Sequence, residues 1–171
     1  SFGRHDEVLD ARAGAPAFEA RAVATRSHSD DYKDGSGERV HSRYTRWSAN
    51  AALAWTPDAR TRIELTGAAS DGEAAYADRA MDGVAFERSN VGLKFRKEAL
   101  SPLVERIEAS AFRNYVDHVM DNYTLRDFRP TAMMLAPAVS NPDRETRGAR
   151  ALVTLKPGEA DRASLGADWQ A

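Results

Sequence analysis

The sequence predicts an all-β fold, an antiparallel up-and-down sheet that forms a segment of a transmembrane β-barrel. Apolar and polar residues alternate along nearly every extended stretch, with the two-residue period of a strand rather than the period of about 3.6 of a helix. Connections alternate between short and long, as in outer-membrane barrels, where one rim has short turns and the other has long loops. The apolar positions are mostly Ala with scattered Leu and Trp, whereas a soluble core needs bulkier Val, Ile and Phe.

The alternation predicts about eight strands. They cover residues 7–12, 18–29, 40–55, 60–70, 86–96, 104–121, 147–155 and 162–169. Short connections follow residues 12, 55, 96 and 155, and long connections follow residues 29, 70 and 121. The connection at residues 56–59 has the chemistry of a tight turn, because Pro57 occupies a favoured turn position.

Each strand is expected to turn one face to lipid and the other to a water-filled lumen. The outward face carries Trp47, Leu53, Ile63 and Leu93, and the inward face carries Arg46, Arg62 and Lys94. Trp55 and Trp169 lie near strand ends, where aromatic side chains form girdles at membrane interfaces. Outer-membrane lipid is therefore an expected partner of the apolar face.

Two other architectures fit part of the pattern. A soluble β-sandwich or lipocalin-like barrel would turn the apolar face inward, into a core that these small side chains would fill poorly. About eight strands could also close into a small barrel. The chain starts without a targeting segment and ends partway through a strand, and an unclosed sheet would leave unpaired edges in lipid. We therefore expect a piece of a larger barrel.

Composition argues against several classes of function. The chain has 171 residues, a formal net charge of −2 and no cysteine, so nucleic-acid binding, disulfides and cysteine-based zinc sites are not expected. No apolar run is long enough for a transmembrane helix. His28 lies beside Ser29 and Asp30, but neighbours in a strand point apart, so no hydrolytic triad and no enzymatic activity are expected. His5 and His41 are interpreted as surface residues without partners.

Residues 104–121 carry the candidate site. Interpreted as one long strand, they place His118 and Met120 two positions apart, so both side chains are expected on the same polar face near the rim. An imidazole and a thioether together suit copper, and the thioether suits Cu(I) in particular. Met133 and Met134 lie in the following long segment, where they either relay Cu(I) or pack the loop as adaptable apolar side chains.

Several short motifs stand out along the chain. They are residues 1–4, 30–35, 55–59, 64–66, 71–74 and 81–83, together with Asn114-Tyr115 and the run Asp117-His118-Val119-Met120-Asp121-Asn122. Together they resemble the TonB-dependent copper receptor family of outer membranes. The resemblance covers nearly the whole chain, and its clustering is specific to the copper receptors rather than to TonB-dependent receptors at large.

The resemblance implies a barrel of about 22 strands plugged by an N-terminal domain. Residues 1–171 would then be a partial barrel domain, with the plug domain and the C-terminal barrel strands absent from this chain. The family binds copper with a His-x-Met pair on a barrel strand and a Cys-x-x-x-Met pair on the plug. His118 and Met120 match the barrel pair, whereas the plug pair has no counterpart here.

The function implied by the resemblance is capture of copper ion at the extracellular side of the bacterial outer membrane, followed by import. Copper would be the bound cargo, and the TonB energy-transducing complex would act through the plug. Two alternatives remain. A receptor for a siderophore or another metal chelate would bind its ligand with aromatic and Arg side chains, and in a passive porin-like barrel His118 and Met120 would be incidental.

Overall fold

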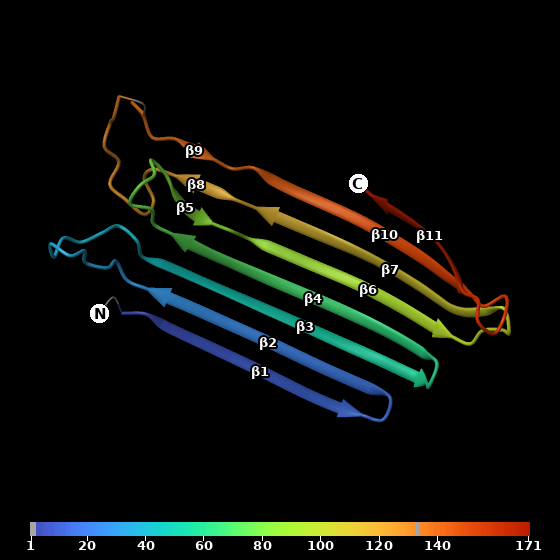
Figure 1. The fold of residues 1–171 in the computed structure, drawn as a ribbon. Helices are drawn as coiled ribbons and strands as arrows, with labels where there is room; N and C mark the ends of the chain where they lie inside the picture. The colour runs from blue at the N-terminus through green and yellow to red at the C-terminus, as the bar shows by residue number, and fades with distance from the viewer. Residues whose placement is uncertain (1–2, 133) are drawn as a thin grey trace.

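One antiparallel sheet makes up the protein. The structure, a computed structural model, describes residues 3–132 and 134–171, which contain eight long and three short strands. The long strands pair in the order β1 (His5–Ala15), β2 (Phe18–Ser29), β3 (Tyr44–Asp58), β4 (Thr61–Ala74), β6 (Arg88–Glu98), β7 (Val104–Asp117), β10 (Asp143–Leu155) and β11 (Ala163–Gln170). Figure 1 shows the tight turns at one end of this open sheet and the long loops at the other. The predicted up-and-down arrangement is therefore confirmed.

Three short strands extend the sheet at its long-loop end. These rim strands are β5 (Asp82–Ala85), β8 (Val119–Asp121) and β9 (Val139–Ser140). β5 pairs with β4 and β8, and β8 also pairs with β9. The loops predicted after residues 70 and 121 are thus partly strand. No helix occurs in the described residues, and none there is long and apolar enough to cross a membrane.

The apolar face forms continuous rows across the sheet. One row consists of Ala20, Leu53, Leu65, Leu93, Ala111, Ala149 and Trp169. Leu53, Leu65 and Leu93 are each 49% exposed, and the buried apolar residues in the described part of the chain are only Ala54 and Ala75. This face does not enclose a core, so the prediction that Leu53 and Leu93 point outward is confirmed and the soluble sandwich is wrong.

The polar face carries rows of charge. Glu64 pairs with Lys94, and Arg62 pairs with Arg96. Adjacent residues of a strand point to opposite faces of the sheet. The side chains of Arg62 and Lys94 are therefore on one face, and those of Ile63 and Leu93 are on the other. This arrangement matches the predicted division between an inward and an outward face.

Two strands run clearly past their predicted ends at the tight-turn end of the sheet. β3 continues through the predicted turn to Asp58, and the turn lies at residues 59–60. The ladder with β4 is irregular between Trp55 and Asp58, which accommodates Pro57, a residue that cannot donate a ladder hydrogen bond. β1 likewise continues past the predicted end at residue 12 to Ala15.

Strand ends differ from prediction at the long-loop end as well, and two of them have a clear cause. Residues 40–43 were predicted as strand, but the amides of Ser42 and Arg43 donate to Oδ1 of Asp31 at 2.8 and 2.7 Å. These donors are therefore taken by a side chain within the loop. In contrast, β10 begins before the predicted residue 147, because Asp143 already pairs with Asp117 of β7.

Candidate metal centre

The predicted long strand over residues 104–121 is interrupted at His118. β7 ends at Asp117 and pairs with β6 and β10, whereas β8 begins at Val119 and pairs with β5 and β9. The His118 amide donates to the Pro142 carbonyl oxygen at 3.1 Å, and the Asp117 amide donates to the Glu87 carbonyl oxygen at 2.8 Å. The chain thus changes pairing partners at His118, and simple alternation along one strand does not extend across this point.

The His118 side chain is half-buried against an aromatic ring. The ring centroids of Phe86 and His118 are 4.7 Å apart with an interplanar angle of 40°. Nε2 of His118 is buried and has no hydrogen-bond partner among the described residues. A buried nitrogen without a partner is unusual in a folded protein, and imidazole nitrogen is the commonest metal-ligating atom of proteins. This nitrogen is therefore the candidate ligand atom of His118.

Met120 occupies the middle of β8, between the two other rim strands. It lies opposite Gly83 of β5 and opposite Ser140 of β9. Like His118, it is half-buried. The rim strands therefore hold the backbone of Met120 on both sides, two residues beyond His118.

Of the two loop methionines, Met133 lies outside the described residues. Met134 folds back toward β8, where Nδ2 of Asn122 donates to its sulfur at 3.4 Å. Asn122 is itself buried and accepts from the Ala138 amide at 2.9 Å. This contact fits the packing role for Met134, and a role in relaying copper stays a prediction.

Of the acidic side chains next to the pair, Asp121 is already engaged in hydrogen bonds. Asp121 accepts from the Tyr123 and Thr124 amides at 3.1 and 2.8 Å and also from the Thr124 hydroxyl, so its carboxylate caps a turn. Within residues 3–132 and 134–171, no group of three or more His, Asp and Glu side chains could hold a metal ion.

A buried carboxylate cross-links the long loops around the candidate centre. Asp82 is fully buried and accepts from Nε2 of His41 at 2.9 Å, from Nε of Arg126 at 2.7 Å and from the Tyr76 amide at 2.8 Å. Burial alone would raise the pKa of Asp82, but these hydrogen bonds together lower it to about 2. We call Asp82, His41 and Arg126 the loop clamp.

The loop clamp corrects the interpretation of His41 as a surface residue without partners. Its members come from residues 30–43, from β5 and from the segment that follows β8. Arg126 also donates to the Tyr76 and Arg79 carbonyl oxygens at 2.8 and 2.9 Å. No local motif signals this arrangement, because His41 and Asp82 are 41 positions apart.

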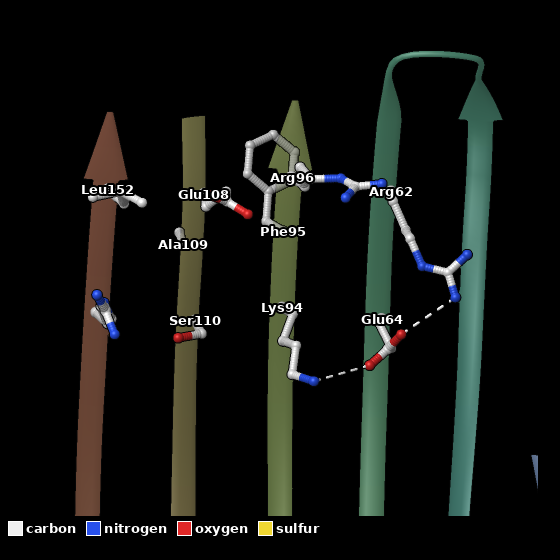
Figure 2. Close-up of a pocket in the computed structure, with 10 residues that line it drawn as sticks. Arg62, Glu64, Lys94, Phe95, Arg96, Glu108, Ala109, Ser110 and Leu152 are labelled. Carbon is white, nitrogen blue, oxygen red and sulfur yellow. Dashed lines mark hydrogen bonds and ion pairs between the residues drawn. The ribbon is translucent and has the colours of Figure 1, made fainter. Parts of the chain in front are cut away.

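A second feature is a charged hollow of about 470 Å³ on the polar face. Figure 2 shows Arg62 and Lys94 both reaching toward Glu64, at 3.3 and 3.2 Å respectively. Arg62 also contacts Glu19 at 3.0 Å. Exposed ion pairs of this kind contribute little to stability, so this surface is suited to facing water or a polar partner.

An open antiparallel sheet with an exposed apolar face, a charged opposite face and long loops at one end is a segment of a transmembrane β-barrel. No protein-family model matches the chain, and no curated protein matches it. It is similar to the solved structure named "Copper transporter OprC", with 44% sequence identity and a TM-score of 0.88 over 99% of this chain. The chain belongs to the TonB-dependent copper receptor family, and it spans 26% of the length of that solved relative.

Proposed function

We propose that this chain is part of an outer-membrane receptor that captures copper at the extracellular side and imports it. His118 and Met120 are its barrel ligands. The observation that carries the proposal is the buried Nε2 of His118, which lacks a partner among the described residues. The chain's similarity to a protein named as a copper transporter supports the choice of metal.

The two side chains have complementary coordination chemistry. A neutral imidazole nitrogen and a thioether sulfur both bind copper, and the thioether favours Cu(I). Two donors do not complete a selective shell, so further ligands come from the plug domain, which is not among residues 1–171. In this proposal the plug also contacts the TonB complex, residues 1–171 form a partial barrel domain, and the barrel transports its cargo without acting as an enzyme.

The experiment removes each donor in the full-length receptor. His118→Ala and Met120→Ala should each strongly lower the copper content of the purified protein, because each removes one ligand. The barrel should remain folded, as judged by its β-sheet circular dichroism. His5→Ala is a matched control, because it removes an exposed imidazole at the start of β1. Wild-type copper content in both single variants would remove these residues from the site.

One observation favours a second candidate, a receptor for an anionic metal chelate. A hollow of about 630 Å³ lies between residues 30–43 and the segment after β8. Its lining combines Arg39, Arg43, Arg126 and Arg129 with the carboxylates of Asp31 and Asp127. Arginine suits bidentate recognition of anionic ligands. Equilibrium binding of free copper and of a ferric chelate to the receptor separates the two: chelate binding without copper binding would favour this alternative.

A further inference from the structure

We propose that Phe86 is a positioning residue for His118. We further propose that residue 83 must be glycine because the Phe86 ring occupies the space that a side chain there would need. The inference rests on the proposed function, in which His118 and Met120 bind copper. It adds two residues that donate no atom to the metal. Phe86 acts through the imidazole, and Gly83 acts through Phe86.

The Phe86 ring contacts the His118 ring and also covers Gly83. Its centroid is 4.7 Å from that of the His118 ring. Gly83 lies against the same ring, and an added Cβ atom there would collide with it. Gly83 is in turn the direct cross-strand partner of Met120. Only a residue without a side chain leaves room for the ring beside Met120.

The backbone around Phe86 is held in place independently of its ring. The Phe86 amide donates to Oδ1 of Asp71 at 2.9 Å. The carbonyl oxygen of the next residue, Glu87, accepts from the Asp117 amide at 2.8 Å. The segments that carry the phenyl ring and the imidazole therefore run side by side with fixed backbones, so the ring contact restricts how the imidazole can turn.

Restricting the imidazole matters for metal binding. A ligand that is already aimed loses less conformational freedom when it binds. Groups that orient a metal-ligating histidine typically change metal affinity by roughly 10–100-fold when they are removed. The phenyl ring cannot orient His118 by hydrogen bonding, so we expect an effect at the lower end, about tenfold.

The test uses the full-length receptor loaded with Cu(I), with affinity measured by competition with a Cu(I) chelator. Phe86→Ala and Phe86→Leu should each lower Cu(I) affinity about tenfold while the copper stoichiometry stays at the wild-type value. Leu keeps apolar volume at the site, so it decides the question if the Ala variant fails to fold. Gly83→Ala should have a similar effect, because the added methyl group would displace the Phe86 ring.

X-ray absorption of the copper-loaded protein reports the imidazole and sulfur ligands separately. A general loosening of the loops would weaken both contributions, whereas loss of the positioning contact should weaken only the imidazole contribution. The imidazole contribution should weaken in Phe86→Leu, whereas the sulfur contribution should persist. Phe112→Leu is the matched control. The Phe112 ring also covers a glycine, Gly148 of β10. Phe112 itself lies on β7, six positions before His118.

The outcomes separate this inference from the proposed function. If His118→Ala binds copper like the wild type, the proposed function fails. If His118→Ala loses affinity but Phe86→Leu and Gly83→Ala do not, only the positioning role is wrong. Equal losses in Phe112→Leu and Phe86→Leu, with an unchanged imidazole signal, would also overturn it.

Discussion

Asp82 illustrates how single residues at the rim combine burial with charge. Its carboxylate is fully buried, yet a guanidinium, an imidazole and a backbone amide all donate to it. Breaking one side of a buried ion pair leaves an uncompensated charge and is strongly destabilising. The local order of three loop segments therefore depends on this residue.

Asp82→Asn should loosen these segments, because an amide cannot match the charge of Arg126. We expect faster limited proteolysis within residues 75–81 and 122–132, with unchanged β-sheet circular dichroism of the barrel. Asp127→Asn, an exposed change in the same segment, is the control. Cleavage at the wild-type rate in Asp82→Asn would contradict a role for the clamp in holding the loops.

The pH dependence of the clamp follows from the same contacts. The pKa of Asp82 is lowered to about 2, below the ordinary value of about 3.9. The stabilisation is therefore complete above pH 4 or so and is lost as the pH falls toward 2. Pepsin cleavage of the loops should rise across this window in the wild type. It should be high and nearly flat across it in Asp82→Asn, and a rise of wild-type size there would contradict the assignment.

At the scale of the strand, we expect the two faces of the sheet to differ in how much a newly introduced charge destabilises the barrel. Leu65 lies in the apolar row between Leu53 and Leu93, and Thr66 follows it on the polar face. Leu65→Arg should cost about 2–4 kcal/mol of barrel stability, because it places a cation toward lipid near mid-strand. Thr66→Arg should cost only about 1 kcal/mol, chiefly through its hydrogen bond to Gly92. Reversible folding into lipid vesicles measures both, and equal costs would contradict the assignment of faces.

At the scale of the whole molecule, we predict that the described residues supply only part of a copper site. Residues 1–171 alone should bind copper weakly in detergent, because His118 and Met120 are two donors and a selective shell needs more. Asp121 cannot contribute readily, since its carboxylate already caps a turn. A copper titration with a competing imidazole or thioether tests this. Tight one-to-one binding that survives competition would show that this segment carries a complete site.

The sequence by itself determined the long strands and their faces. Leu53 and Leu93 were assigned to one face and Arg62 and Lys94 to the other, and the structure agrees. This succeeded because alternation is a local property: each side chain's preference for lipid or water is expressed along its own strand. The pair His118 and Met120 was likewise identified from adjacent residue types, and its role in copper binding stays a prediction.

Only the tertiary structure decided where strands begin, end and break. The loop near Asp31 replaces a predicted strand start because a carboxylate takes the amide donors. The break at His118 occurs because the rim strands offer new pairing partners beyond Asp117. The contacts of Asp82 with His41 and of Phe86 with His118 join residues far apart in the chain. Such contacts depend on which backbones the fold brings together, and a two-residue pattern carries no information about that.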